Sequence, residues 1–501
     1  MFTKSIGKVE ESVTSLESYF RPFRNHILGI DKTFISPYGE QKIIYTDWTA
    51  SGRLYTPIEN KMKDDFGPFV ANTHTETSIM GTTMTHSYQK ARTIIKEHVG
   101  ADKNDVLLTC GSGMTGVINK FQRILGLKAP ENLQSQLDFS KIERPVVFVS
   151  HMEHHSNQTS WLETIAEVVV IPCNELGLFC LENFKEVLGS YKDASYKIAS
   201  ITSCSNVTGI KTPYYEVARM MHEQNGLCFV DFACSGPYID IDMHPEDQPE
   251  SYLDAIFFSP HKFLGGPGAS GVLVFSSTLY KNTIPDNPGG GTVTWTNPWG
   301  GHTYIEDIEV REDGGTPGFL QAIRISLAVR LKDKMGVDKM MAREEELLDI
   351  FFTHLENNPK INILAGEHKD RLGVISFIIE GIHHDLAVKI LNDRYGIQSR
   401  GGCSCAGTYG HYLLAIDEPT SDDLVNRLYK GELTSKPGWI RVSIHPTTTN
   451  QEANLVCNAI NEVAKNAQEW AKEYVAHGST YYHISEEKEA SSACQESWFE
   501  F

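Results

Sequence analysis

The chain has 501 residues, and its 45 Lys and Arg against 64 Asp and Glu give a formal net charge of -19. Hydrophobic residues are 41% and charged residues 22% of the chain, a globular composition that argues against global disorder. The acidic balance argues against nucleic-acid binding, which needs clustered Lys and Arg. The first residues lack the apolar segment of a secretory signal, and no run reaches the ~20 apolar residues of a membrane span, so we expect a cytoplasmic protein without a membrane partner.

Short apolar runs alternate with helical segments in the first half of the chain. The runs are residues 106–109, 145–150, 167–172, 197–203, 227–232, 255–259 and 271–275. Such near-continuous apolar runs are typical of strands that are buried on both faces of a parallel sheet. Amphipathic segments between them, such as residues 213–225, are long enough for crossover helices. The pattern predicts an α/β fold with a mostly parallel, seven-stranded sheet.

The composition changes after residue 275. Residues 285–318 are rich in Gly and Pro and predict a long loop, followed by a helical stretch from 320 to 352. Strands at 371–379 and 439–444, with helices at 385–395 and 450–474, predict a second, smaller α/β unit. We therefore expect three parts: an N-terminal segment, 1–45, that packs with the small domain; a large domain, 46–318; and a linking helix with the small C-terminal domain, 319–501.

Polar residues follow several of the predicted strands. A Gly/Ser/Thr turn lies at 110–115, three histidines lie within 151–155, and Asp231 and Lys262 come at the ends of two further runs. The carboxyl ends of parallel strands share one edge of the sheet, where ligands bind. Backbone N–H groups at a helix start bind phosphate, a Lys forms a Schiff base with an aldehyde, and an Asp pairs with a pyridine nitrogen. Together these groups predict a site for pyridoxal 5'-phosphate (PLP).

Several short motifs match one group of PLP enzymes. Residues 258–262 carry a Ser-x-His-Lys motif, residues 152–157 are Met-Glu-His-His-Ser-Asn, residues 205–209 are Ser-Asn-Val-Thr-Gly, and residues 315–317 are Gly-Thr-Pro. From about Tyr45 to Ala464 the sequence resembles the fold type I PLP enzymes of the aminotransferase class V family. The resemblance is strongest to the branch of cysteine desulfurases and selenocysteine lyases.

This resemblance implies a role for each matching residue. Lys262 would carry PLP and act as the base, Asp231 would pair with the pyridine nitrogen, and His154 would stack on the ring. Asn206 would contact the ring hydroxyl, and Thr316 would reach the phosphate in the neighbouring subunit of a homodimer. The phosphate in the same subunit would be bound by Gly113, Met114, Thr115, Ser259 and His261.

Residues 400–406, Arg-Gly-Gly-Cys-Ser-Cys-Ala, lie where desulfurases of this branch carry Arg-x-Gly-x-x-Cys-Ala. The match implies that Cys405 attacks the substrate sulfur and that Arg400 and Arg441 bind the substrate. On an extended loop Cys403 would face the same side as Cys405, so both thiols could enter the pocket. The Cys-x-Cys spacing also resembles molybdenum cofactor sulfurases. One Cys pair near His411 offers few ligands for zinc, and we expect no metal.

The sequence departs from the desulfurase pattern in two places. Desulfurases usually have Asp-x-Ala-Gln, with the Gln at the ring oxygen, whereas this chain has Asp231-Phe-Ala-Cys234-Ser235. The loop from 292 to 304, with Trp295 and Trp299, is longer than the resemblance leads us to expect. Either departure could reshape the substrate pocket without changing the cofactor chemistry.

The leading hypothesis is a PLP-dependent enzyme that removes sulfur from L-cysteine, or selenium from selenocysteine, to give alanine and a persulfide on Cys405. A second hypothesis is another class V reaction, such as that of an aminotransferase, lyase or epimerase, with Cys405 incidental, because one fold supports many reactions. A third is a non-catalytic sulfur-relay protein. The leading hypothesis also implies a sulfur-acceptor protein as a partner.

Overall fold

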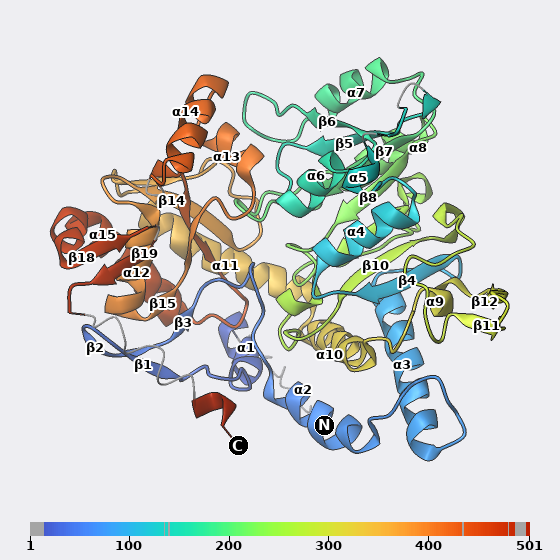
Figure 1. Cartoon of the computed structure of the whole chain (residues 1–501). Coiled ribbons are helices and arrows are strands. Elements are labelled where there is room, and N and C mark those ends of the chain that lie inside the picture. The colour runs from blue at the N-terminus through green and yellow to red at the C-terminus, as the bar shows by residue number, and fades with distance from the viewer. Residues whose placement is uncertain are drawn as a thin grey trace, which may run out of the picture.

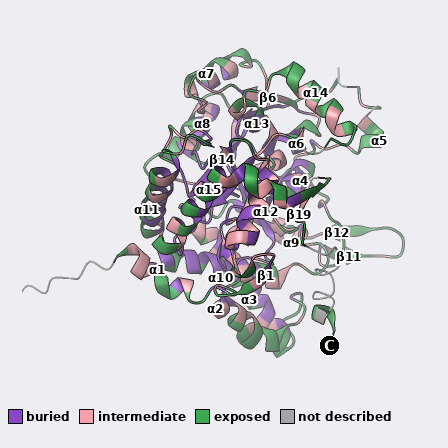
Figure 2. Ribbon diagram, turned by 90° about the vertical axis from the view of Figure 1, so that its left-hand side faces the viewer, coloured by how far each residue is buried: buried purple, intermediate pink, exposed green. Residues whose placement is uncertain are grey.

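The chain folds into two lobes, each built around one main sheet. The computed structural model describes residues 15–134, 136–138, 141–432, 435–478, 480–485 and 497–500. Figure 1 shows the larger lobe in cyan and green beside the smaller lobe in orange and red. Buried residues lie along the central strands of both lobes, whereas outlying helices such as α14 (Glu418–Tyr429) are largely exposed (Figure 2). Within these residues no helix is long and apolar enough to cross a bilayer.

The large lobe contains a seven-stranded sheet in the order β4-β10-β9-β8-β7-β5-β6. Its strands are β4 (Asp105–Cys110), β5 (Val146–Ser150), β6 (Glu167–Ile171), β7 (Lys197–Thr202), β8 (Leu227–Asp231), β9 (Ala255–Phe258) and β10 (Gly271–Ser276). Only β10 runs against its neighbours, and all the other pairings are parallel. The predicted α/β fold with a mostly parallel, seven-stranded sheet is confirmed. Six strands therefore end at the same edge.

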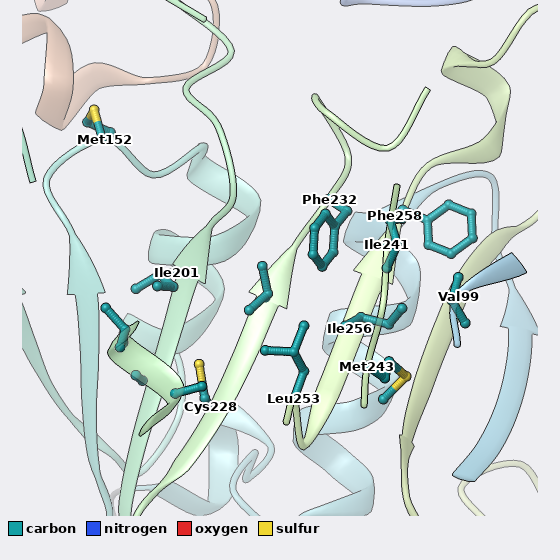
Figure 3. Packing of buried hydrophobic residues seen from close by; sticks show 14 of the residues in the cluster. Val99, Met152, Ile201, Cys228, Phe232, Ile241, Met243, Leu253, Ile256 and Phe258 are labelled. Carbon is teal, nitrogen blue, oxygen red and sulfur yellow. The ribbon is translucent and has the colours of Figure 1, made fainter. Parts of the chain in front are cut away.

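Helices cover both faces of this sheet, as the continuous apolar runs predict. One face packs against α4 (Met114–Ile124) and α6 (His155–Leu162). The other face packs against α3 (Ile79–His98), α7 (Leu181–Ser190), α8 (Tyr214–His222) and α10 (Phe319–Met335). Successive strand residues serve opposite faces: Val147 belongs to the first core and Phe148 to the second. Figure 3 shows part of the second core, including Ile201, Cys228 and Ile256.

The small lobe contains a four-stranded antiparallel sheet in the order β13-β14-β17-β16. Its strands are β13 (Ile361–Ile363), β14 (Val374–Ile379), β17 (Trp439–Ser443) and β16 (Arg400–Gly402). Its core also takes side chains from α11 (Val337–Leu355), α12 (His384–Tyr395) and α15 (Asn450–Trp470). A capping box between Thr449 and Glu452 fixes the start of α15. The second, smaller α/β unit thus has a core of its own.

The described part of the N-terminal segment contacts the small lobe. It contains α1 (Leu16–Arg24), β1 (Thr33–Ser36), β2 (Gly39–Lys42) and β3 (Ile44–Tyr45). Helix α1 contacts α11, and β3 pairs in parallel with β15 (Ile397–Gln398). Phe20 and Phe23 also pack in a cluster with Tyr55, at the start of the large lobe. Residues 1–14 lie outside the described residues, and the domain boundaries at 45 and 318 stay predictions.

Three sequence expectations differ from the structure. Residues 285–318 are not wholly loop, because they form the hairpin of β11 (Val293–Thr296) and β12 (His302–Tyr304) and the short helix α9 (Ile308–Arg311). The predicted helix 320–352 is two helices, because Gly336 adopts a left-handed backbone with φ 77° between α10 and α11. Helix α15 ends at Trp470, since Tyr474 begins a hairpin of β18 (Tyr474–His477) and β19 (Thr480–His483).

Besides short 3-10 turns, four further helical elements occur in the described chain. They are α2 (Thr56–Asn60), a π-helix at Lys61–Phe66, α5 (Glu131–Gln134) and α13 (Gly407–Leu413). Helix α13 directly follows the cysteine loop and buries Tyr409 against the large-lobe core. The loop is therefore fixed to the large lobe on one side and continues from β16 of the small lobe on the other.

Candidate active site

A cavity of about 410 Å³ lies at the carboxyl edge of the large sheet. Residues after β4, β5, β7, β8 and β9 form its floor, and residues of the small lobe and of the segment after β3 close it. The predicted residues that line it are Gly113, Met114, Thr115, His154, Asn206, Asp231, Ser259, His261, Lys262, Arg400, Cys405 and Arg441. This is the place where ligands bind in parallel α/β sheets. The chemical roles of these residues stay predictions.

Lys262 and Asp231 face the cavity from two neighbouring strand ends. Lys262 lies in the single 3-10 turn Pro260–Lys262, which follows β9. Burial lowers the pKa of Lys262 from its ordinary value, and the charges of Cys234 and Asp231 oppose that shift. Burial raises the pKa of Asp231 to about 6, although its Oδ1 accepts a hydrogen bond of 2.7 Å from the Ala233 N–H. A lowered amine pKa favours nucleophilic attack on an aldehyde.

His154 begins α6 as its N-cap and lines the same cavity. Its Nδ1 accepts a hydrogen bond of 3.1 Å from the Ser156 N–H. Burial, followed by the charge of Lys262, lowers the pKa of His154 to about 3. The imidazole is therefore neutral at neutral pH, and a flat neutral ring suits stacking on a heteroaromatic group. The nearby His151 and His155 instead contact the Gly177 carbonyl oxygen and the Gly407 N–H.

The start of α4, where the sequence predicts phosphate binding, lines one part of the cavity. Gly113 is the N-cap and has no side chain that could cap the N–H groups of the first turn. Ser259 Oγ accepts a hydrogen bond of 2.9 Å from the Met114 N–H. A Cβ at Gly113 would lie 3.2 Å from Ser259 Oγ and 3.4 Å from the His261 ring. Any larger residue at position 113 would therefore fill the cradle between α4 and the Lys262 turn.

The cysteine loop is a tight turn, and the expectation of an extended loop is wrong. Ser404 and Cys405 both have a left-handed backbone, with φ 51° and 57°. Asn206 Nδ2 donates a 2.7 Å hydrogen bond to the Ser404 carbonyl oxygen, and the His155 N–H donates one of 2.8 Å to that of Cys405. Cys405 is exposed and lines the cavity, whereas Cys403 packs beside the large-lobe core. Two consecutive strained residues therefore present Cys405 alone.

An aspartate that the sequence analysis did not identify joins the two predicted substrate arginines. Asp47 Oδ1 accepts a hydrogen bond of 2.8 Å from the Arg441 guanidinium, and Oδ2 accepts one of 3.0 Å from Arg400 Nε. Arg441 also donates to the Asn206 carbonyl oxygen at 3.0 Å. The segment carrying Asp47 is fixed to β17, where the Thr49 N–H donates to Ser443 Oγ. Asp47 follows the two-residue strand β3, which is too short for a clear periodic signal.

The departure from the Asp-x-Ala-Gln pattern places a thiol in the cavity. Cys234 lines the cavity, whereas Ser235 Oγ is turned away into a buried hydrogen bond with Ser203 Oγ. Cys204, which follows β7, lines the same wall. Cys234 stands out in the sequence by its position after Asp231, whereas no sequence motif indicates a role for Cys204.

Thr316 does not line the cavity of its own chain. It is exposed and lies in a second hollow of about 840 Å³, which shares Ser112 and His261 with the first. Asn72 Nδ2 donates a hydrogen bond of 3.4 Å to Thr316 Oγ1. Thr316 therefore does not reach the cavity of its own subunit, and its role in a neighbouring subunit stays a prediction.

Comparison with known proteins places the whole arrangement in one family. The sequence model of the family described as "Aminotransferase class-V" matches residues 44–456. A probable cysteine desulfurase of Staphylococcus aureus (strain COL) is 26% identical over 372 residues, which cover 73% of this chain and 84% of that protein. A probable cysteine desulfurase of Staphylococcus epidermidis is 27% identical over the same shares.

Solved structures share the fold at lower identity. The apo structure of a cysteine desulfurase from Thermococcus onnurineus NA1 has a TM-score of 0.69 at 20% identity and covers 89% of this chain and 98% of its own. The cysteine desulfurase CsdA from Escherichia coli has a TM-score of 0.68 at 21% identity with the same coverage. The fold type I architecture is thus confirmed, and the chain belongs to the aminotransferase class-V family of PLP-dependent enzymes.

Proposed function

We propose that this protein is a PLP-dependent cysteine desulfurase, which converts L-cysteine to L-alanine and leaves the sulfur as a persulfide on Cys405. The observation that carries the proposal is the exposed Cys405 thiol on the wall of the cavity that also holds Lys262, Asp231 and His154. The relatives named as probable cysteine desulfurases support the same reaction. A reactive cysteine on an accessible turn close to Arg400 suits sulfur transfer, because attack requires a thiolate.

Several features of the cavity fit PLP. Asn206 Oδ1 and Arg441 Nε are buried and have no hydrogen-bond partner within the described residues. The uncapped first turn of α4 fits a phosphate, with Met114, Thr115, Ser259 and His261 around it. Lys262 would hold the aldehyde carbon, Asp231 the pyridine nitrogen, His154 one face of the ring and Asn206 its hydroxyl oxygen. When bound, PLP supplies an electron sink for the bond-breaking steps.

The side chains of the chain divide the reaction between them. Arg441 and Arg400 would bind the substrate carboxylate through their planar guanidinium groups. Lys262 would take the proton from the substrate α-carbon, which its lowered pKa favours. The Cys405 thiolate would then attack the substrate sulfur, so that the carbon–sulfur bond breaks and a sulfur–sulfur bond forms. One L-cysteine and one enzyme thiol thereby give one L-alanine and one enzyme persulfide.

The surroundings of Cys405 support a protein as the sulfur acceptor. Cys405 is exposed at the cavity mouth, and the neighbouring Arg400 side chain is 48% exposed. A partner's thiol can therefore approach the persulfide without entering the cavity. The nine cysteines of the described residues are all free, which is usual in a reducing compartment and supports a cytoplasmic location.

We further propose a homodimer. Thr316 and the hairpin residues Trp295 and Trp299 lie on the surface, and the two tryptophans are 66% and 88% exposed. Large exposed aromatic side chains commonly mark a protein interface, and most oligomers are symmetric dimers. Analytical ultracentrifugation of the purified protein should give twice the chain mass, and a fully active monomer would contradict the proposal.

The activity test is incubation of the purified protein with PLP, L-cysteine and dithiothreitol, following sulfide and alanine together. Equal amounts of the two products are expected. Selenocysteine in place of cysteine measures the preference between sulfur and selenium. An alanine-free product such as pyruvate, or unchanged turnover in Cys405→Ala, would favour another class V reaction with Cys405 incidental. No turnover of any amino acid would favour a sulfur-relay protein.

A further inference from the structure

Two cysteines that the proposed reaction does not use lie deep in the cavity wall. Cys204 follows β7 and Cys234 follows β8, and these neighbouring strands are paired in parallel with Thr202 opposite Asp231. Cys204 is 0% exposed and Cys234 is 5% exposed, yet both line the cavity. A small molecule inside the cavity can therefore reach these thiols, although they are not exposed on the outer surface of the protein.

The two thiols face one another across a single carbonyl group. Cys204 Sγ lies 3.5 Å from the Ser205 carbonyl oxygen, and Cys234 Sγ lies 3.8 Å from the same oxygen. Burial and the neighbouring Cys234 raise the pKa of Cys204, whereas the contact with Cys204, aided by the charges of Lys262 and Arg441, lowers the pKa of Cys234. Of the two thiols, Cys234 is therefore the one that loses its proton more readily.

We propose that Cys204 and Cys234 are a modification site: a dithiol that small peroxides oxidise to a reversible disulfide across the cavity wall. The other two buried cysteines among the described residues lack this arrangement. Cys228, which lies on β8 itself, points into the hydrophobic core of the large lobe (Figure 3), and Cys457 is buried in the core of the small lobe.

The chemistry is complete with a peroxide as the oxidant. The Cys234 thiolate attacks one oxygen of hydrogen peroxide, the oxygen–oxygen bond breaks, and after proton uptake a sulfenic acid and one water result. The Cys204 sulfur then attacks the sulfenic sulfur, and a second water leaves with the Cys204 proton. Two thiols and one peroxide thus give one disulfide and two waters. A dithiol reductant restores the thiols by exchange.

A disulfide between Cys204 and Cys234 would change the two loops that carry these cysteines, and both loops contribute to the proposed cofactor site. The loop of Cys234 starts at Asp231, whose carboxylate is held by the Ala233 N–H, so displacement of Cys234 displaces Asp231. The loop of Cys204 carries Asn206, which holds the Ser404 carbonyl oxygen of the cysteine loop. Because these residues are the proposed PLP contacts, this effect rests on the proposed function. We expect the disulfide to weaken PLP binding about tenfold.

The test uses the full chain with Cys405→Ala, which removes the most exposed thiol of the cavity. The protein is treated with hydrogen peroxide, its remaining thiols are alkylated, and the peptides are mapped by mass spectrometry. We expect one new cross-linked peptide pair, joining Cys204 to Cys234, that disappears after dithiothreitol treatment. Cys228→Ser is the matched control, because Cys228 lies on β8, the strand that leads to Cys234, but outside the cavity, and the link should form unchanged in it. Cys204→Ala and Cys234→Ser should each abolish the link.

The PLP affinity of oxidised and reduced protein is then compared by equilibrium titration. Full alkylation of both cysteines after peroxide treatment, or a link to any other cysteine, would overturn the proposal. A link that forms without changing PLP affinity would refute the effect on the cofactor site. The cross-link does not depend on desulfurase activity, so wild-type protein that forms the cross-link but releases no sulfide would contradict the proposed function alone.

Discussion

The two walls of the cavity differ in burial and in how the fold holds them. The large-lobe wall takes Asp231, Lys262 and His154 from the carboxyl ends of β8, β9 and β5, inside a core that is closed on both faces. The small-lobe wall presents Arg400 and Cys405 on an exposed strand end and a strained turn. The ends of the strands hold their side chains in place, whereas the exposed turn leaves the Cys405 thiol open to the substrate and to a sulfur acceptor. The first wall suits a resident cofactor, and the second suits sulfur transfer to another molecule.

The largest effect is expected on the buried wall, for Lys262→Ala. Purified wild-type protein should be yellow, with absorption near ~410–420 nm from PLP held by lysine. The variant should lose this band and at least ~1,000-fold of its activity, because the group that holds PLP and moves the α-proton is gone. Absorption spectra and sulfide release measure the two losses. A wild type that stays colourless after PLP is added would contradict the cofactor assignment.

On the open wall, Cys405→Ala should lower sulfide release by ~100-fold or more and leave the absorption band intact, since only the sulfur acceptor is lost. The matched variant is Cys403→Ala, two residues earlier on the same loop. Its rate should fall much less, because Cys403 packs beside the large-lobe core instead of lining the cavity. The reverse ranking of the two variants would place the attacking thiol at Cys403 and relate the loop to molybdenum cofactor sulfurases.

A smaller effect should come from Asp47, the aspartate that joins the two arginines of the small-lobe wall. In Asp47→Asn the guanidinium groups of Arg400 and Arg441 lose their shared carboxylate and repel each other. We expect KM for L-cysteine to rise ~5-fold with a smaller change in kcat, because the residue positions the arginines without touching the reacting atoms. Steady-state kinetics separate the two constants. A loss confined to kcat would mean that Asp47 acts in the chemical step.

The difference between the walls also decided what the sequence could predict. Lys262 and Asp231 follow long apolar runs, so the end of each run indicates where the side chain meets the edge of the sheet. The turn at Ser404 and Cys405 gives no such signal, because its conformation depends on hydrogen bonds from Asn206 and His155, which are distant in the sequence. The roles of Asp47 and Cys204 could not be predicted from the sequence for the same reason, since their partners lie in other segments.

The smallest expected effect concerns Glu344, which is buried behind the Cys234 wall. Burial raises the pKa of Glu344 to about 8, and the Gly373 N–H donates a 3.3 Å hydrogen bond to its Oε2. In the unfolded chain the pKa of this carboxyl is near its ordinary value of 4.5. Between about pH 4.5 and pH 8 the folded protein therefore binds the Glu344 proton more tightly than the unfolded chain does. The contribution of protonated Glu344 to the free energy of unfolding is fully present below about pH 4.5 and is lost as the pH rises toward 8.

Glu344→Gln keeps the carbonyl oxygen but cannot ionise, so the variant should escape this loss. We expect its melting temperature to exceed that of the wild type at pH 8, by an amount that corresponds to about 1 kcal/mol or more of unfolding free energy, and the difference to shrink toward pH 5. Glu345→Gln is the matched control, because Glu345 is the exposed neighbour on the same helix. Thermal scans of the three proteins at about pH 5.5, 6.5, 7.5 and 8 measure how the melting temperature of each changes with pH. Parallel curves for wild type and Glu344→Gln would mean that water reaches Glu344 and that the buried wall is more open than its packing indicates.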